Sequence, residues 1–451
     1  MGLQNPAHTD GNGVTGRLEK LVAQSPAPEV TAHRLDRLRE DPVARDIIDR
    51  LSPDALTGLV RIIGTSRFLY HALCRHPDSI TLIGQPFDPE APTHDEINNI
   101  ADLRRYKYRE LLKITWMDLA DVCGYEEILS ALSHLADIVI RNAGRLAGSS
   151  KVSVANRPLN EQLVLFALGK LGAYELNYSS DVDLIFVCAN LDGDAGLQLQ
   201  EAAVNYIRRF TRLLEEQTEE GFLYRVDLKL RPWGKSGPLA LTVNDTEQYY
   251  EASTEAWERF AWLRARRVDG PDNIGTELLD RLKPFVFRRT LSAQDLQRFL
   301  RIKTDMADAR TRQGCWNVKV GDGGIRDIEF FVQILQLING ARFPVLRGTG
   351  TLTALDALVL CGLMEGDEQQ QIRDSYLFLR RLENRLQIMD ERQTQDLPED
   401  TGERLFLARS LGFTGTSDEE TLARFENTLH AHRQTARQYF ERIRLEENQF
   451  V

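Results

Sequence analysis

The spacing of apolar residues predicts a chain that is helical over most of its length. From residue 30 to residue 148, apolar side chains recur at intervals of three and four, as at Leu56, Leu59 and Ile63, which is the period of an amphipathic helix. After about residue 285 this period returns and continues to the end of the chain. Residues 1–28 are polar and have no such period, so we expect a flexible tail there.

The pattern changes between about residues 151 and 285. The run 163–168 (LVLFAL) is continuously apolar, and 181–187 (DVDLIFV) is a second apolar run headed by two aspartates, so both are predicted to be buried strands. Residues 196–219 have one apolar helical face, and residues 223–230 alternate strictly between apolar and polar. We therefore predict an α+β domain with a small mixed sheet at 151–285. It is flanked by an N-terminal helical region (29–150) and a C-terminal helical bundle (286–451).

Charge and composition exclude several classes of protein. The 451 residues carry a net charge of −11, which disfavours a general nucleic-acid-binding protein because phosphate contacts need a basic face. No run of eighteen apolar residues and no apolar N-terminal signal segment occur, so we expect no membrane span and a cytoplasmic location. The five cysteines are scattered without a Cys-x-x-Cys pair, which argues against a zinc site and a disulfide framework.

Two aspartates at the head of the second predicted strand form the sharpest candidate site. Because strand side chains alternate, Asp181 and Asp183 project from one face, and their mutual repulsion is costly unless a cation lies between them. The later alternating strand places Asp227 on a polar face with the cations Arg225, Lys229 and Arg231. Such a face suits an anion-binding wall with one metal ligand. For an isolated Asp-x-Asp, an ordinary solvated strand end is the alternative.

Magnesium chemistry would explain three carboxylates in this arrangement. Hard divalent cations take carboxylate and phosphate oxygens, and two such ions can clamp a phosphoryl or nucleotidyl displacement. The turn before the aspartates adds groups that could face a phosphate, although an ordinary turn is the alternative here as well. These groups are Gly169, Lys170, Ser179 and Ser180.

The motif GKLGAYELNYSSDVDLIFV (169–187) resembles the signature of the bifunctional glutamine synthetase adenylyltransferase/adenylyl-removing enzyme family. That family belongs to the polymerase-β-like nucleotidyltransferase superfamily, whose pattern is a small-residue turn, an acid-x-acid pair and a third acid on a later strand. The segments 67–80, 225–242, 319–342 and 382–398 also resemble blocks of the family. Family enzymes carry two such halves. The motifs ELNYSSDVDL and GGIRDIEFFVQ resemble the N-terminal, adenylyl-removing half, so we expect this chain to be one half, as a fragment or a split protein.

The resemblance implies a fold and a reaction. The expected fold is a polymerase-β-like nucleotidyltransferase catalytic domain at 151–285, and the expected reaction is phosphorolysis: orthophosphate removes AMP from a tyrosine of glutamine synthetase and leaves as ADP. Two Mg²⁺ ions, or Mn²⁺, would be held by the catalytic residues Asp181, Asp183 and Asp227. The nucleotide and phosphates would contact Gly169, Lys170, Ser179, Ser180, Lys229 and Arg231. The family also implies the PII signalling protein and glutamine as effectors.

Three other functions remain open from the sequence. The same site could run in the opposite direction, as an adenylyltransferase that uses ATP. It could modify a small molecule, although the long helical flanks favour a protein substrate. It could also be a non-catalytic regulatory module, against which the intact aspartates argue. Asp327 and Glu329, on a predicted helix, could reach the site, but a solvated face or an ion pair with Arg326 is the favoured interpretation.

Overall fold

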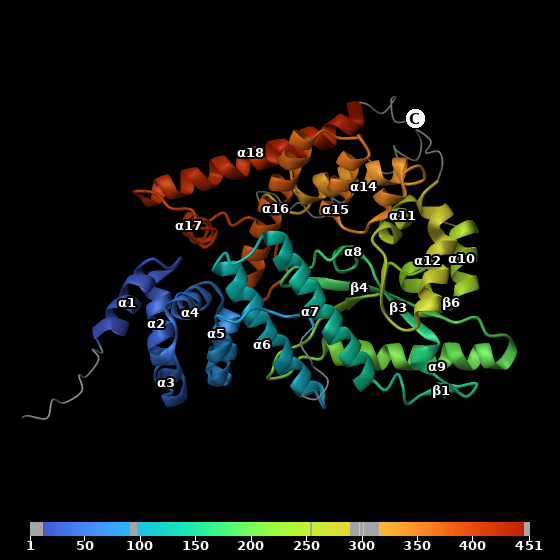
Figure 1. Ribbon diagram of the computed structural model, residues 1–451, viewed down its shortest axis with the longest axis horizontal. Helices are drawn as coiled ribbons and strands as arrows, with labels where there is room; N and C mark the ends of the chain where they lie inside the picture. Colours follow the sequence, from blue (N-terminus) through green and yellow to red (C-terminus); the bar gives the residue numbers. More distant parts are fainter. Residues whose placement is uncertain are drawn as a thin grey trace, which may run out of the picture.

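The computed structural model describes residues 12–90, 97–252, 255–288, 297, 301 and 315–445. Its N-terminal part is helical as predicted, and many of the helices begin at a residue that can cap them: Ser52, Ser66 and Asn99 each accept a backbone N–H of the first turn. Figure 1 shows the first helices, in blue, at one end of the molecule. The elements are α1 (Asn12–Ala23), α2 (Pro28–Leu38), α3 (Pro42–Arg50), α4 (Pro53–Thr65), α5 (Arg67–Arg75), the 3-10 helix η1 (Pro77–Leu82), α6 (Ile100–Leu119) and α7 (Tyr125–Leu146).

The prediction of a flexible tail is wrong for residues 12–23, which form helix α1. Leu18 of this helix is 3% exposed and belongs to the same apolar core as α4, against which α1 packs. The apolar residues of the tail are too few for a clear helical period. The helix therefore depends on a tertiary contact rather than on a pattern of its own.

The middle of the chain forms a small mixed sheet. Its order is β5-β4-β3-β7, and β6 pairs with β4 beyond the end of β5. Strand β4 runs parallel to β5 and β6 and antiparallel to β3, which confirms the predicted mostly helical α+β fold with a mixed sheet. The strands are β3 (Leu163–Ala167), β4 (Asp181–Cys188), β5 (Arg225–Asp227), β6 (Ala240–Thr242) and β7 (Arg266–Asp269), with a separate hairpin of β1 (Ser153–Val154) and β2 (Arg157–Pro158) and a 3-10 turn η2 (Leu159–Glu161).

Each face of the sheet is covered by a different apolar core. Val182, Leu184 and Phe186 of β4 join the core that contains α7 and α9 (Gly193–Glu215), whereas Ile185 and Val187 join the core that contains the C-terminal helices. In Figure 1, α9 and the orange C-terminal helices accordingly lie on opposite sides of the strands. The aspartates of β4 share the face of Ile185 and Val187. The other elements of this region are α8 (Gly169–Gly172), η3 (Gly234–Ser236), α10 (Val243–Ala252), α11 (Ala256–Leu263) and α12 (Asp272–Val286).

The C-terminal part is a helical bundle, in which α18 packs along α14 and α16. Its elements are α14 (Ile325–Asn339), η4 (Pro344–Arg347), α15 (Thr351–Leu360), α16 (Gly366–Ile388), α17 (Thr401–Ser410) and α18 (Asp418–Leu445). The helical prediction for residues 289–314 falls almost wholly outside the described residues. Within the described ranges, no helix combines the length and the apolar character that crossing a membrane requires.

A buried ion pair joins all three regions of the chain. The guanidinium of Arg385, in α16, binds both carboxylate oxygens of Asp118, in α6, and the Nη2–Oδ1 distance is 2.7 Å. Tyr178, in the loop before β4, donates its hydroxyl to the same carboxylate at 3.1 Å. Both side chains of the pair are 0% exposed. This contact therefore ties the helices on either side to the loop that leads into the aspartates.

Candidate active site at the paired aspartates

Strands β4 and β5 bring the acidic residues together. In their parallel register, Asp183 lies directly opposite Asp227, and Asp181 lies opposite Arg225. Asp181 and Asp183 are two residues apart on one strand and therefore share a face. We expect the three aspartates to lie on adjacent strands with their carboxylates within range of a shared metal. The strand pairing confirms the first part, but the side chains of the described residues are not placed as a three-carboxylate metal site.

Two of the three carboxylates are paired with cations. Asp181 Oδ1 is 2.7 Å from Arg225 Nε, and Asp227 Oδ2 is 2.6 Å from Lys229 Nζ. The backbone N–H of Lys229 also donates to Asp227 Oδ1 at 2.7 Å. These contacts fix the orientation of Asp181 and Asp227 without using Asp183.

Asp183 carries the most perturbed carboxyl of the site. Burial, together with the negative charges of Asp227 and Asp181, raises the pKa of Asp183 to about 6. No described residue donates a hydrogen bond to its side chain. A carboxylate with like charges beside it and no donor is the kind of group that a bound cation stabilises.

Gly169 lies against this carboxylate. It has a φ of +57°, and a Cβ atom added there would overlap Oδ2 of Asp183. The predicted glycine turn is the one-turn helix α8, and its start is held to β4 by the Leu168 N–H, which donates to the Asp183 carbonyl at 2.9 Å. Glycine is therefore needed here both for its φ and for the close approach of the backbone to the site.

Lys170, in α8, pairs with a glutamate of α16. Its Nζ lies 2.8 Å from both carboxylate oxygens of Glu383, whose side chain is 0% exposed. Burial lowers the pKa of Lys170, an effect that the charge of Glu383 opposes. The structure thus places the predicted phosphate-binding lysine in a contact between the sheet and the C-terminal bundle.

The two predicted serines have different surroundings. Ser179 is buried: its N–H donates to Gln387 Oε1 and its hydroxyl to the Glu391 carbonyl, both at 2.9 Å. Arg225 in turn donates to the Ser179 hydroxyl and carbonyl at 3.2 Å. Ser180 is half-buried beside Asp181, and its hydroxyl has no hydrogen-bond partner among the described residues. Ser179 thus holds the loop before β4 against α16 and Arg225, whereas the hydroxyl of Ser180 is available to bind a ligand.

The predicted strand 223–230 is shorter than expected, because only Arg225–Asp227 pairs with β4. The chain turns after Asp227, which accepts the N–H of Lys229. As a consequence, Arg231 does not continue the predicted polar wall. Its guanidinium donates to four backbone carbonyls of the segment between β5 and β6, those of Leu228, Lys235, Gly237 and Pro238.

Two cations that the sequence analysis did not single out lie near Asp183. The positive charges of Lys319 and Arg326 act against the rise in the pKa of Asp183. Burial lowers the pKa of Lys319, and no described residue pairs with its ammonium group. Both residues lie in the segment 319–342 that resembles a family block, but a single sequence shows no period that directs them toward residue 183.

The side chains of Asp327 and Glu329 are both buried, at 1% exposed. The prediction of a solvated helix face is therefore wrong for these two residues. Glu329 lies 3.2 Å from both Arg326 and Arg264, which confirms the predicted ion pair with Arg326. Asp327 accepts the backbone N–H of Gly323 at 2.9 Å at the start of α14.

The donor chemistry of the site fits a hard divalent cation, because carboxylate oxygens on two adjoining strands are what Mg²⁺ takes. Among the described residues, however, no three histidine, cysteine or acidic side chains stand close enough together to hold a metal ion as they are placed. In this arrangement Asp181 pairs with Arg225 and Asp227 pairs with Lys229. A metal at this site would have to compete with those two cations.

Sequence comparisons show the class of protein. The family profile described as Glutamate-ammonia ligase adenylyltransferase matches residues 56–281, and the profile described as GlnD PII-uridylyltransferase matches residues 297–443. Both descriptions name nucleotidyltransferases, in agreement with the sheet and the paired acids. Because the first match covers half of the chain, the protein belongs to the glutamate-ammonia ligase adenylyltransferase family.

Individual relatives agree with this assignment. Proteins named bifunctional glutamine synthetase adenylyltransferase/adenylyl-removing enzyme are 37% identical in Stenotrophomonas maltophilia, 35% in Nitrosococcus oceani and 31% in Shewanella woodyi. The matches cover 82%, 86% and 91% of this chain, but 41%, 42% and 46% of those proteins. The chain thus spans less than half the length of the curated relatives it matches.

Proposed function

We propose that this protein removes AMP from adenylylated glutamine synthetase by phosphorolysis. An oxygen of orthophosphate attacks the α-phosphorus of the adenylyl-tyrosine, and the bond from phosphorus to the tyrosine oxygen breaks. The products are ADP and a tyrosine phenolate that takes up a proton. Tyrosine has a pKa of about 10, so it leaves without strong acid catalysis.

One observation carries this proposal: Asp183 lies opposite Asp227 on paired strands. Its carboxylate lies against Gly169, where a Cβ atom would overlap it. This arrangement offers oxygen ligands on one side of the transferring phosphoryl group. Lys319, Arg326 and Lys229 supply positive charge near the same carboxylates. Such charge favours the binding of two phosphates and stabilises the charge that develops between them.

Asp183 and Asp227, with Asp181 beside them, would hold the divalent ions, for which we propose Mg²⁺ or Mn²⁺. When bound, such ions neutralise phosphoryl charge. Arg225 and Lys229 orient two of the carboxylates, and Ser180 is free to bind a phosphate oxygen. The preference for removal of AMP rests on the motifs ELNYSSDVDL and GGIRDIEFFVQ. Regulation by PII and glutamine also remains a proposal from the family.

The direction of the reaction can be tested with the two forms of glutamine synthetase. We expect the full chain to release ADP from the adenylylated form, and to do so only with orthophosphate and a divalent cation. AMP released without phosphate would make the protein a hydrolase. Incorporation of AMP from ATP into the unmodified form, without ADP release from the adenylylated form, would show that the chain is an adenylyltransferase.

Replacement of Gly169 by alanine is expected to lower ADP release by about a hundredfold, since a displacement of about 1 Å at a reacting centre has an effect of this size. The added Cβ would push the Asp183 carboxylate from its position. Gly193→Ala is the matched control, because Gly193 has a similar φ of +61° but open space around its Cβ position. Equal activities of the two variants would show that the contact between residues 169 and 183 is unimportant.

A further inference from the structure

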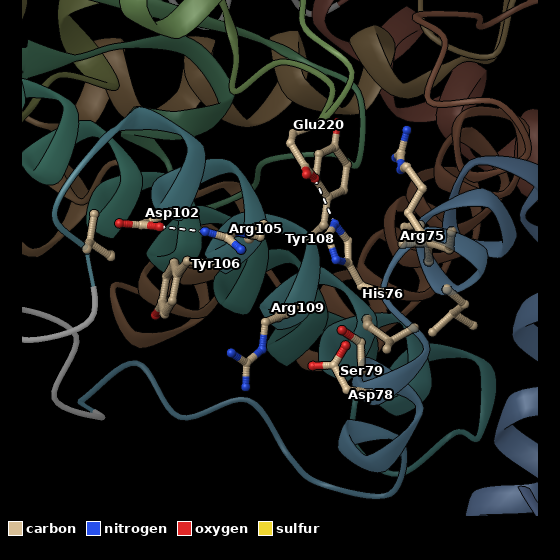
Figure 2. Close-up of a pocket in the computed structure, with 15 residues that line it drawn as sticks. Arg75, His76, Asp78, Ser79, Asp102, Arg105, Tyr106, Tyr108, Arg109 and Glu220 are labelled. Carbon is tan, nitrogen blue, oxygen red and sulfur yellow. Dashed lines mark hydrogen bonds and ion pairs between the residues drawn. The ribbon is translucent and has the colours of Figure 1, made fainter. Parts of the chain in front are cut away.

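The N-terminal helices enclose a cavity that is separate from the aspartate site. Its volume is about 480 Å³, and it lies between α5, η1, α6 and the loop that precedes β5. Figure 2 shows the polar side chains that surround it. Small-molecule sites have volumes of about 300 to 1,000 Å³, so this cavity has the size of one.

The cavity combines an apolar wall with positive charge. The half-buried rings of Tyr106 and Tyr108 line it, whereas the lining leucines Leu69, Leu73 and Leu112 are 2% exposed or less. Arg75 donates to the backbone carbonyl of Glu219 at 2.6 Å and forms no ion pair with a residue that the structure describes. Arg109, which lines the cavity and is labelled in Figure 2, is exposed and has no hydrogen-bond or ion-pair partner among the described residues.

The other charges of the cavity are partly paired. Arg105 binds Asp102 at 2.7 Å, whereas Glu220 is hydrogen-bonded to His76 at 2.8 Å, a contact that compensates its charge only when the imidazole is protonated. Asp78 lies on the rim and adds one negative charge. Its presence disfavours a polyanion and favours a ligand with a single anionic group.

We propose that this cavity binds a small organic anion, whose carboxylate or phosphate group meets Arg109 and whose apolar body lies against Tyr106 and Tyr108, and that this binding is coupled to strands β4 and β5. The planar guanidinium group matches carboxylate and phosphate oxygens through paired hydrogen bonds. The proposal does not depend on the reaction that the aspartates perform.

A chain of hydrogen bonds leads from the cavity to the aspartates. Tyr108, on the cavity wall, donates to Glu391 Oε2 at 3.0 Å, and the Glu391 carbonyl accepts the Ser179 hydroxyl at 2.9 Å. Ser179 accepts from Arg225 at 3.2 Å, and Arg225 binds Asp181 at 2.7 Å. Each of these contacts joins segments that are distant in sequence. A movement of Tyr108 would therefore be passed to Arg225, the residue that holds Asp181 in place.

The loop before β5 forms a second connection. Glu220 lines the cavity, and a Cβ atom at the adjoining Gly221 would overlap the Tyr108 ring and hydroxyl. The carbonyl of Phe222 accepts from Lys107 Nζ at 3.2 Å. The same loop continues directly into β5 and Asp227, so a ligand that shifts it also shifts that strand.

Binding can be tested with 1-anilinonaphthalene-8-sulfonate, an organic anion with an apolar aromatic body and a fluorescence signal. We expect Arg109→Gln, at an exposed position, to weaken its binding to the full chain about tenfold, the loss of one charge-assisted contact. Arg424→Gln is the control, because Arg424 is an exposed arginine on α18. Equal affinity of the wild type and Arg109→Gln would overturn the proposal. Competition by phenyl phosphate against phenylacetate then shows whether phosphate or carboxylate is preferred.

Coupling can be tested by hydrogen exchange, which does not depend on activity. We expect saturating 1-anilinonaphthalene-8-sulfonate to slow amide exchange in residues 225–231 of the wild type. Tyr108→Phe keeps the ring but removes the donor to Glu391, so the effect on residues 225–231 should fall at least about twofold while the dye still binds. Unchanged exchange in the wild type on dye binding, or the same effect in Tyr108→Phe, would show that the cavity is not coupled to β5 in this way.

Discussion

Asp183→Asn is expected to lower the release of ADP from adenylylated glutamine synthetase by about a thousandfold. Stabilisation of a phosphoryl transition state by metal ions has a value of several kcal/mol, and a thousandfold loss corresponds to about 4 kcal/mol. The substitution removes one negative charge from the carboxyl that has no hydrogen-bond donor among the described residues, with little change in volume. Initial rates with saturating orthophosphate measure the effect.

Folding should survive this substitution. The pKa of Asp183 is raised to about 6, above its unfolded value of 3.8, so its ionised form destabilises the folded protein progressively from about pH 4 and fully above about pH 6. Without divalent cations at pH 7.5, Asp183→Asn should therefore melt no lower than the wild type. Asp280→Asn, in an exposed ion pair on α12, serves as the control and should keep full activity. Full activity of Asp183→Asn would place the active site elsewhere.

Arg385→Met is expected to lower the free energy of unfolding by about 3 to 5 kcal/mol, because it leaves Asp118 as an uncompensated buried charge. The guanidinium binds both oxygens of Asp118. Burial lowers the pKa of Arg385, but the charge and hydrogen bonds of Asp118, together with Tyr125 and Tyr178, raise it above its usual value. Urea unfolding followed by tryptophan fluorescence measures the loss.

The same two helices provide a matched control for this prediction. Arg381, one turn earlier on α16, binds Asp121 at 3.1 Å just after α6, but the two side chains are 29% and 74% exposed. Arg381→Met should change the free energy of unfolding by less than about 1 kcal/mol. The double variant Asp118→Asn/Arg385→Met should recover part of the loss, since it removes the unpaired charge. Equal effects of the two single substitutions would mean that the buried pair has no special role.

Local patterns were sufficient for the elements and for the acidic pair. Continuous apolar runs predicted β3 and β4, and the alternation of strand side chains placed Asp181 and Asp183 on one face. A helical period predicted α9 and the flanking helices. The position of Asp227 on the polar face of a later strand also followed, because polar and apolar residues alternate from residue 225 to residue 231. These features depend on interactions between residues close in sequence.

The partner of each charged side chain was not predictable in this way. Lys170 looked suited to a phosphate, but the fold brings it to Glu383, 213 residues later. Arg231 looked like part of a polar wall, but the strand ends at Asp227 and the guanidinium binds loop carbonyls instead. A cationic side chain can bind a ligand phosphate, an acidic side chain or a backbone carbonyl. The residues next to it in the sequence therefore do not show which partner it has in the fold.

The sequence by itself therefore determined the class of fold, the glycine turn and the three aspartates with their shared strand geometry. Only the tertiary structure decided that β5 stops after three residues, that α16 supplies Glu383 and Arg385, and that Lys319 comes near Asp183. Periodicity is a property of one segment and can be read along the chain. Charge pairing across distant segments depends on how those segments pack, because burial makes an unpaired charge costly and so selects the partner.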